Sequence, residues 1–345
     1  MSPQKNKHPN YQAQIQSRRD FLGKVAVSGA IVGGLGYCSL APETWRGSRQ
    51  DLKGLRGLPQ EDHIVLKDFR VAKPNALTPE VVNCQGSGSA QNLKACLDAL
   101  GGLRHYCGPG DIVLVKPNVA FDRSPILGAT SNPFLLDVLI KMLLRDCRVA
   151  EVRVADNPIE SPADCFAKSG IGKASLDAGA RIVLPDSNAF ETLHTPGAAL
   201  IENWTFFSRP FKRVTKVIGL SPIKDHNLCF ASMGLKNWYG LLGGPRNQFH
   251  QDIHGIVSDL ALMIHPTLTI LDGSHVLMKN GPTGGDPSHV KLGDAVVVGL
   301  DPVALDTWAF EHLLERGKKY PAYLAMAEAK GAGKMDLSGR FKALT

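Results

Sequence analysis

The chain concentrates lysine, histidine and carboxylate side chains in one stretch, residues 221–285 of its 345. Lys224 and His226 follow an apolar segment that ends near Leu220, and Asp272 follows a second apolar segment. An imidazole beside a carboxylate can move protons, and a lysine attracts an anion. We therefore predict that Lys224, His226 and Asp272 form a catalytic group. A solvated loop and a turn-forming Asp-Gly pair are the alternative interpretations.

Further lysines and side-chain amides stand at the ends of predicted strands or beside glycines. A small anion accepts hydrogen bonds from both kinds of side chain, and the glycine-rich segment 280–285 could form a backbone nest for it. We therefore predict a small anionic ligand. The predicted substrate-binding residues are Lys116, Asn118, Lys236, Asn237 and Asn280.

Two histidines are separated by four residues, so a helix would place His250 and His254 on one face. This spacing occurs when two imidazoles bind one cation, and the sequence therefore predicts a divalent metal held by His226, His250 and His254. Gln251 stands where a metalloprotease carries its basic glutamate. Solvated or structural histidines are the alternative. The chain has no Cys-x-x-Cys pair, so no iron–sulfur cluster is expected.

The first 41 residues have the pattern of a twin-arginine export signal. Arg18 and Arg19 precede a short stretch, residues 25–40, that is too glycine-rich and too short to span a membrane. We expect cleavage after Ala41, the twin-arginine translocase as a partner, and a periplasmic or otherwise exported location. The large Tyr37 before Cys38 argues against a lipoprotein.

Composition and charge limit the function classes. With 43% hydrophobic and 21% charged residues, the composition is that of a globular protein. It excludes a disordered chain and a multi-span membrane protein. The net charge is +7, but residues 1–41 carry a net +4, which leaves +3 for the rest. No basic cluster occurs in that remainder. Nucleic acid is therefore not an expected partner.

Strand and helix patterns alternate after a polar linker at residues 42–62, which predicts a single α/β domain over residues 63–345. The predicted strands are 63–69, 111–116, 149–155, 181–184, 267–271 and 295–300, with antiparallel strands at 201–207 and 213–220. The predicted helices are 90–100, one that begins at 133, 162–168, 172–178, 234–242, 252–264, 302–314 and 321–330. We predict a mostly parallel sheet flanked by helices, with the antiparallel strands as an insertion in the middle. The carboxyl ends of its strands would gather the polar residues in one cleft.

Six strings of this sequence, in order, resemble the domain of unknown function 362 family. They are DIVLVKPN (111–118), VRVAD (152–156), GLKNWYG (234–240), PTLTILDG (266–273), NGP (280–282) and GLDPVALD (299–306). The resemblance implies a single α/β domain. Some members add a ferredoxin-like domain with iron–sulfur clusters, and this chain has no such cysteine-rich module.

The resemblance also bears on individual residues. Asp225 stands where the family's Lys-Thr-His motif has threonine, which removes any role for that hydroxyl. The positions that match the family's polar residues are Lys224, His226, Lys236, Asn237, Asp272, Asn280, Asp301 and Asp306.

Two functions fit these observations. One is an exported enzyme that acts on a small anionic substrate with metal assistance. The other is a non-catalytic protein that binds a ligand or assists periplasmic redox assembly.

Overall fold

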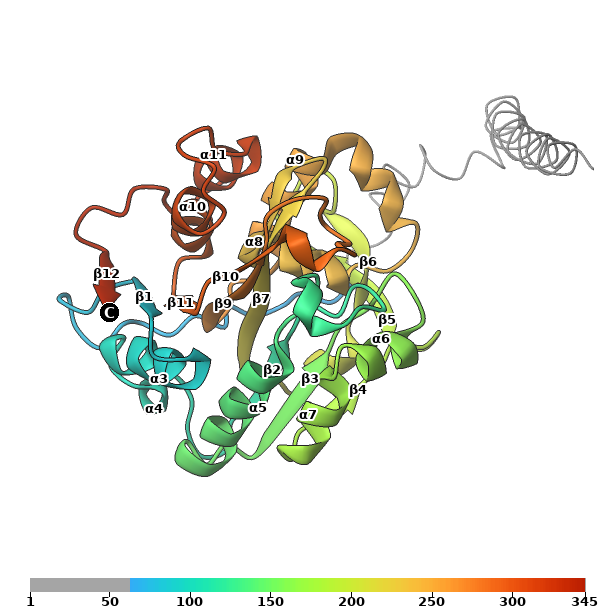
Figure 1. The fold of residues 1–345 in the computed structure, drawn as a ribbon. Coiled ribbons are helices and arrows are strands. Elements are labelled where there is room, and N and C mark those ends of the chain that lie inside the picture. The colour runs from blue at the N-terminus through green and yellow to red at the C-terminus, as the bar shows by residue number, and fades with distance from the viewer. Residues whose placement is uncertain (1–62, 345) are drawn as a thin grey trace, which may run out of the picture. The chain divides into compact units, whose positions relative to one another are not determined.

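The computed structural model of the protein describes residues 63–344, and a ten-stranded mixed sheet lies at its centre (Figure 1). Its strands are β1 (Val81–Gln85), β2 (Ile112–Lys116), β3 (Glu151–Ala155), β4 (Arg181–Val183), β7 (Lys216–His226), β8 (Phe230–Ser232), β9 (Leu268–Leu277), β10 (Val290–Leu292), β11 (Ala295–Gly299) and β12 (Phe341–Leu344). The order across the sheet is β12-β1-β11-β9-β7-β2-β3-β4, with β8 beside β7 and β10 beside β9. Strands β5 (Phe190–His194) and β6 (Asn203–Phe207) form a separate antiparallel pair.

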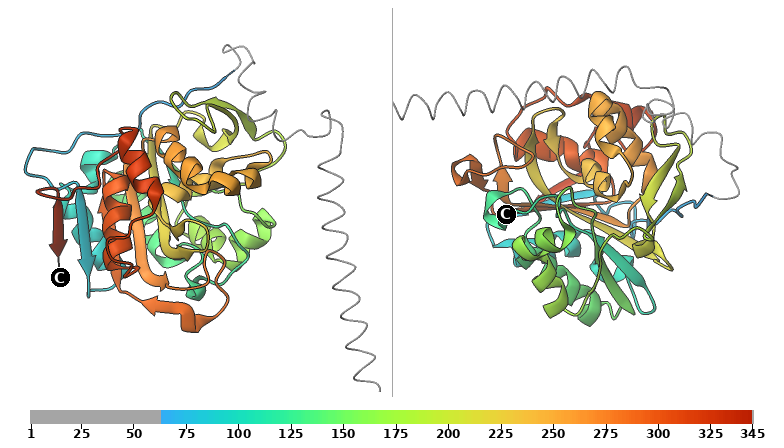
Figure 2. Two further views of the ribbon diagram at one scale, coloured as in Figure 1. Left: turned by 90° about the horizontal axis from the view of Figure 1, so that it is seen from above. Right: turned by 90° about the vertical axis from the view of Figure 1, so that its right-hand side faces the viewer.

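Helices cover both faces of this sheet (Figure 2). They are α3 (Ser89–Ala99), α4 (Leu103–Tyr106), α5 (Pro133–Lys141), α6 (Pro162–Lys168), α7 (Ile171–Asp177), α8 (Gly234–Asn237), α9 (Ile253–Met263), α10 (Pro302–His312) and α11 (Ala322–Ala329). Strands such as β2 and β11 are apolar along nearly their whole length because neither face meets water. The fold class predicted from the sequence is confirmed.

Two apolar clusters hold the helices to the sheet. On one face, Leu97 of α3 and Leu139 of α5 pack with Val113 of β2. On the other, Phe310 of α10 packs with Leu271 of β9. Helix α5 begins as its sequence indicates, because the Asn132 side chain accepts a hydrogen bond from the backbone amide of Phe134 at 2.9 Å.

The first strand was predicted in the wrong place. Residues 63–69 are an extended connection that makes a single bridge, between Ile64 and Leu193. The strand of the sheet is β1, which lies between β12 and β11. Pairing decides this difference, because an apolar segment becomes a strand only where a neighbouring strand offers it a continuous ladder.

The prediction that residues 213–220 are antiparallel is also wrong. Strand β7 pairs in parallel with β2 on one side and with β9 on the other, at the middle of the sheet. It also continues past Leu220 to His226, through a register shift between Pro222 and Lys224. The last residues, Lys224 to His226, then pair antiparallel with β8. Lys224 and His226 are therefore strand residues rather than loop residues.

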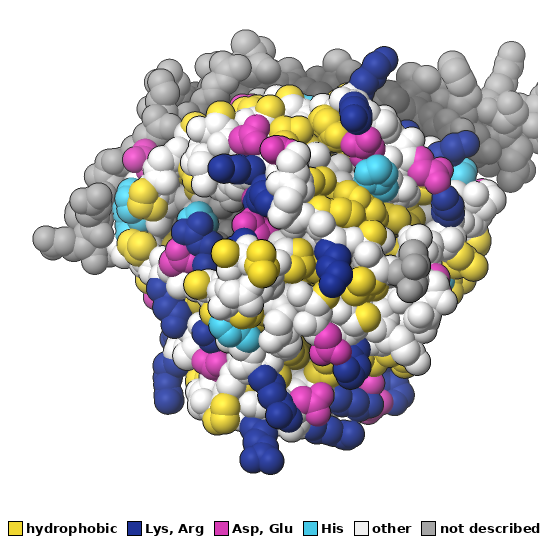
Figure 3. All heavy atoms as spheres, turned by 90° about the vertical axis from the view of Figure 1, so that its left-hand side faces the viewer, with side chains coloured by type: hydrophobic (Ala, Val, Ile, Leu, Met, Phe, Trp, Pro, Cys, Tyr) yellow, Lys and Arg dark blue, Asp and Glu magenta, His cyan; other side chains and the backbone are white. Residues whose placement is uncertain are grey.

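The described residues all fall within one compact unit. The signal predicted for residues 1–41 and the linker predicted for residues 42–62 lie outside them. No helix between residues 63 and 344 has the length and apolar character needed to cross a bilayer. Basic and acidic side chains are interspersed over the face shown in Figure 3.

Candidate functional site

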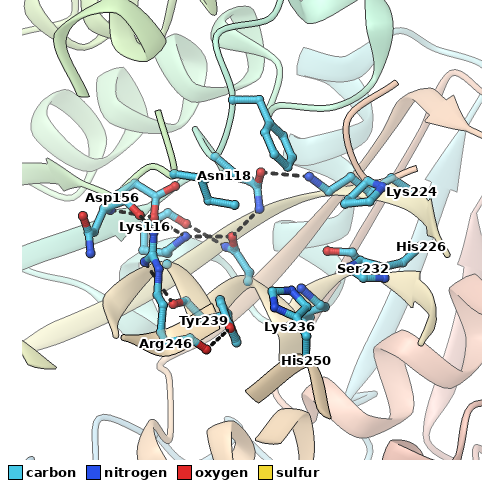
Figure 4. Close-up of a pocket in the computed structure, with 17 residues that line it drawn as sticks. Lys116, Asn118, Asp156, Lys224, His226, Ser232, Lys236, Tyr239, Arg246 and His250 are labelled. Carbon is cyan, nitrogen blue, oxygen red and sulfur yellow. Dashed lines mark hydrogen bonds and ion pairs between the residues drawn. The ribbon is translucent and has the colours of Figure 1, made fainter. Parts of the chain in front are cut away.

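A small cavity lies where the ends of β2, β3 and β7 meet helix α8 (Figure 4). Its volume is about 60 Å³, which holds a few water molecules or one small anion. The polar lining consists of Lys116, Asn118, Asp156, Asn157, Lys224, His226, Ser232, Lys236, Asn237, Tyr239, Arg246 and His250. Ala120, Phe121, Ile159, Gly240 and Pro282 complete the wall.

A buried ion pair forms one end of the cavity. Strands β2 and β3 are parallel neighbours, so Lys116 at the end of β2 meets Asp156 directly after β3, with 2.7 Å between Nζ and Oδ1. The carboxylate also accepts hydrogen bonds from the amides of Val119 at 2.7 Å and Asn157 at 3.0 Å. Burial lowers the pKa of Lys116, and the Asp156 charge opposes that shift.

Gly240 is part of this arrangement because its backbone presses against the ion pair. A Cβ atom at this position would stand 2.1 Å from Asp156 Oδ1 and 2.8 Å from Lys116 Nζ. Both distances are too short for any side chain. The amide of Asn157 also donates to the Gly240 carbonyl at 2.9 Å, which fixes the approach of the two segments.

Two asparagines link the lysines in one hydrogen-bonded chain. Lys116 Nζ donates to Asn237 Oδ1 at 2.9 Å, and Asn118 Nδ2 donates to the same oxygen at 3.2 Å. Lys224 Nζ then donates to Asn118 Oδ1 at 3.0 Å and to the carbonyl of Ala129 at 2.7 Å. Both amides are therefore fully oriented, and Lys116 and Lys224 are held in fixed positions.

Lys224 is buried among cations. Burial first, and then the charges of Lys236 and Lys116, lower its pKa to about 7, while Asp156 opposes the shift. Its ammonium lies 5.4 Å from the centre of the Phe121 ring, a cation–π contact. A lysine in this position changes its charge near neutral pH.

Lys236 differs from the other two lysines of the cavity. Within residues 63–344 its ammonium has no hydrogen-bond acceptor and no carboxylate, and it lies 4.8 Å from the centre of the Tyr239 ring. Burial lowers the pKa of Lys236, Cys229 opposes this shift, and Arg246 adds to it. Its amine is therefore free to meet a ligand.

The two histidines of the cavity present opposite groups. The Leu228 amide donates to His226 Nδ1 at 3.2 Å, so the proton of that ring is on Nε2. His250 Nδ1 lies 2.9 Å from the Asn247 carbonyl, which can only accept, so His250 keeps a free lone pair on Nε2. Burial, Lys236, Lys224 and His250 together lower the pKa of His226 to about 2. His226 is therefore a neutral donor, and His250 is an acceptor.

Arg246 stabilises the wall rather than offering its charge freely. Its Nη2 donates to the carbonyls of Asn157 and Pro158 at 2.9 Å each, and its Nη1 donates to the Leu242 carbonyl at 3.0 Å. The Tyr239 hydroxyl donates back to the Arg246 carbonyl at 2.6 Å. The guanidinium thereby joins the segment after β3 to the segment after α8.

Seven of the predicted site residues lie around this one cavity. They are Lys116, Asn118, Lys224, His226, Lys236, Asn237 and His250. Three others, Asp272, His254 and Asn280, lie elsewhere.

Asp272 is buried beneath helix α5, outside the cavity lining. Its Oδ2 accepts from the Asn132 amide at 2.9 Å, and its Oδ1 accepts from the Ser274 amide at 3.1 Å and hydroxyl at 2.6 Å. Strand β9 continues to Leu277, so Asp272 lies within the strand rather than at its end. Its contacts support the start of α5.

His254 is also outside the lining. Its ring lies between those of Phe230 and Tyr323, with centroids 6.1 Å from each. Helix α9 begins only at Ile253, after the 3₁₀ turn η7 (Arg246–Asp252) that carries His250, so the expected one-face helical spacing does not form. Among residues 63–344 no group of three or more His, Cys, Asp or Glu side chains is placed to hold a metal ion. The three histidines therefore do not share a metal site there.

Asn280 is exposed, and its side-chain amide contacts the ring of His289 at 3.2 Å. It has a left-handed backbone, with φ of 56°, and stands just before the cavity-lining Pro282. Its role is therefore in the turn of the loop rather than in the lining.

Sequence reasoning missed five polar residues of the lining. Asp156 and Asn157 had a signal, because they directly follow a predicted strand beside the one that ends in Lys116. Ser232, Tyr239 and Arg246 had none, since their places depend on how the segments after β7 fold back over the sheet.

A family model described as domain of unknown function (DUF362) matches residues 113–311, which include every residue of the cavity lining. The chain belongs to this family. One relative is the thylakoid-associated protein sll1697 of Synechocystis sp. (strain ATCC 27184 / PCC 6803 / Kazusa). It is 25% identical over 252 residues, which are 65% of this chain and 74% of that protein.

Two solved structures overlap with part of this DUF362 protein. The lactate racemase apoprotein from Thermoanaerobacterium thermosaccharolyticum is 16% identical with a TM-score of 0.34, over 67% of this chain and 55% of that one. A Thermotoga maritima protein solved by structural genomics is 12% identical with a TM-score of 0.38, over 68% and 60%. The chain thus spans less than two thirds of either protein. These partial structural overlaps do not indicate what reaction, if any, this protein catalyses.

Proposed function

We propose that this protein is an exported enzyme that binds a small anionic substrate in the cavity beside Lys236. The observation that carries the proposal is the charge of the lining. Four cationic side chains, Lys116, Lys224, Lys236 and Arg246, face one carboxylate, Asp156. A cavity with this excess of positive charge is stabilised when an anion enters it.

Several donors remain free for that anion. The Lys236 ammonium and the Ser232 hydroxyl have no hydrogen-bond partner in the described part of the chain. His226 adds its Nε2 proton and stays uncharged. Together they suit a carboxylate or phosphate group, whose oxygens accept several hydrogen bonds at once.

An acid–base role is supported by His250. Its Nε2 lone pair is free, and it lines the same cavity as the His226 donor, so the imidazole can accept a proton from a bound ligand. A protein that only stored an anion would have no need of an acceptor beside the donors. This feature favours the enzyme over a non-catalytic binding protein.

Calorimetric titration of the folded protein with acetate and with inorganic phosphate tests the anion site. We expect Lys236→Met to weaken binding by about tenfold or more, because a hydrogen bond to a charged group is worth roughly 1.5–3 kcal/mol. The matched control is Lys291→Met, which removes an exposed lysine paired with Glu315 and should leave affinity unchanged. Equal affinity in the wild type and in Lys236→Met would refute the proposal.

Export by the twin-arginine route is the second part of the proposal, and it is supported by the Arg18-Arg19 pair of the sequence. The double substitution Arg18→Lys with Arg19→Lys should retain the protein in the cytoplasm while preserving the charge. Lys5→Arg is the matched control and should leave export intact. Cell fractionation measures both. Unchanged export of the double variant would exclude this route.

A further inference from the structure

The three lysines of the cavity differ in the number of hydrogen-bond acceptors that the protein gives each ammonium group. Lys116 Nζ has Asp156, Asn237 and the Pro117 carbonyl as acceptors, all within 2.9 Å. Lys224 has an amide oxygen and a carbonyl. Lys236 has no acceptor within residues 63–344, although the cavity gives a ligand access to its amine. A lysine that only balanced charge would be expected to have an acidic partner.

We propose that Lys236 is a nucleophilic amine that forms an imine with the carbonyl group of a small keto or aldehyde acid. The nucleophile in such a reaction is the neutral amine. Lysine is made neutral by burial or by a neighbouring cation. Lys236 is enclosed in the cavity wall, and it shares the Tyr239 ring with the Arg246 guanidinium, at 4.8 Å and 5.9 Å from the ring centre. The inference rests on the proposed anion site, since the acid group of the ligand has to be held there.

Electrostatics of the neighbouring groups agree with this role. Burial and Arg246 lower the pKa of Lys236, and the Cys229 thiol is the opposing group. The Lys236 charge in turn lowers the pKa of Lys224 and of His226. Loss of the Lys236 proton therefore relieves repulsion within the cavity and leaves the other cations to hold the ligand.

Size and charge define the substrate class. A cavity of about 60 Å³ admits a compact molecule, so the ligand is a short acid rather than a nucleotide or a sugar phosphate. Its carboxylate would accept from His226 Nε2 and from the Lys224 ammonium. Its carbonyl carbon would then lie toward Lys236. Glyoxylate and pyruvate have this combination of groups.

The reaction balances without an oxidant or reductant. The Lys236 lone pair attacks the carbonyl carbon and forms a C–N bond, while the carbonyl π electrons move to oxygen. His250 Nε2 takes a proton from the new ammonium and returns it to that oxygen, which gives a hydroxyl group. A proton from the protonated His250 ring lets the hydroxyl leave as water while the nitrogen lone pair forms the C=N bond. The iminium nitrogen then gives its last proton back to His250, so no net proton is consumed and the imine remains. Amine and carbonyl thus yield imine and water.

Reductive trapping tests the inference on the full chain. The protein is incubated with pyruvate or glyoxylate and cyanoborohydride, and the secondary amine that results is located by peptide mass mapping. We expect one adduct, at Lys236, formed at least about tenfold faster than at any exposed lysine. Excess inorganic phosphate should suppress it, because phosphate would occupy the same site.

Variants separate the alternatives. Lys236→Arg should lose the adduct while its thermal unfolding shows that it is folded, and the exposed control Lys291→Arg should keep it. If Lys236→Arg does not fold, peptide mapping of the wild-type protein still shows whether the adduct forms at Lys236. Calorimetric binding of acetate without an adduct at Lys236 overturns the imine but leaves the anion site standing. Equal labelling of exposed lysines also overturns the imine. Absence of any anion binding overturns both proposals.

Discussion

The Asp306 carboxylate on helix α10 accepts a hydrogen bond from the backbone amide of Gly234 at 2.8 Å, at the start of the short helix that carries Lys236. Its other oxygen accepts from the Leu235 amide at 3.0 Å. A Cβ at position 234 would stand 2.9 Å from Asp306 Oδ1, so glycine lets the backbone approach. Asp306 is thus a positioning residue, since it acts on the cavity through helix α8.

Replacing Asp306 by alanine should leave two buried amides without acceptors. We expect the free energy of unfolding to fall by about 3 kcal/mol, because each buried unsatisfied amide costs roughly 1–3 kcal/mol. Acetate affinity should fall as well, since α8 is no longer fixed. Urea unfolding and calorimetry measure the two effects. Asp164→Ala, on an exposed position of α6, is the control and should change stability by no more than about 0.5 kcal/mol. Equal stability of the two variants would contradict the assignment.

The buried pair of Lys116 and Asp156 gives a second prediction. Lys116→Met leaves the Asp156 charge buried and unpaired, so unfolding free energy should fall by about 3–5 kcal/mol. Adding Asp156→Asn removes that charge and should restore part of the loss. Lys173→Met, in an exposed pair with Asp177, is the control and should leave the free energy of unfolding nearly unchanged. A double variant less stable than Lys116→Met would count against the charge argument.

Gly240 offers a test of close packing at the same ion pair. Gly240→Ala places a methyl group 2.1 Å from Asp156 Oδ1, and we expect a loss of about 1–3 kcal/mol with weaker acetate binding. Gly108→Ala is matched in chemistry, but a Cβ there has nothing within 4 Å. Thermal unfolding of the two variants should therefore differ clearly, and similar melting temperatures would show that the cavity wall adapts.

Acetate affinity should depend on pH through Lys224. Its pKa of about 7 means that the cation is lost as pH rises through neutrality, so affinity should fall between about pH 6 and about pH 8. Lys224→Met should bind more weakly and show a flatter profile over that range. Calorimetry at several pH values measures this. His226, with a pKa of about 2, stays neutral throughout and adds no slope.

The same shift affects stability. The native pKa of Lys224 lies below its usual 10.5, so between about pH 7 and 10.5 the unfolded chain binds more protons than the native one. The contribution of Lys224 to the free energy of unfolding therefore rises with pH across that window. Lys224→Met should lack this rise in urea unfolding, and an identical slope in both proteins would show that other groups cause it.

Two cysteines are positioned to react with each other. Cys84 Sγ on β1 and Cys96 Sγ on α3 lie 2.7 Å apart, and both side chains are buried. With oxidised glutathione as the oxidant we expect a disulfide between them, which should stabilise the fold by about 2–3 kcal/mol. Peptide mapping without reduction detects it. Cys165 is the control, and its free thiol should be alkylated after denaturation. If Cys84 and Cys96 were alkylated to the same extent as Cys165, no disulfide would have formed.

The sequence by itself determined that Lys116 and Asn118 stand where a buried strand ends. Lys116 and Asn118 follow a run of apolar residues that only a strand covered on both faces explains, and parallel strands bring such ends to one edge. The start of α5 could also be predicted from neighbouring residues alone, because the Asn132 N-cap and the proline at the first helical position act within one turn. Local patterns of this kind need no knowledge of distant segments.

Only the tertiary structure decided which of these residues meet. Strand β7 continues to His226 because β8 offers it a partner, and β9 continues past Asp272 because β10 pairs with its residues 275–277. Hydrogen bonds between strands thus fixed where each strand ends, which removed Asp272 from the cavity and kept Lys224 in it. Arg246 reaches the cavity only because backbone carbonyls after β3, some ninety residues earlier in the chain, accept from its guanidinium. Such contacts depend on the folded path of the chain, so they cannot be predicted from the spacing of residues in the sequence.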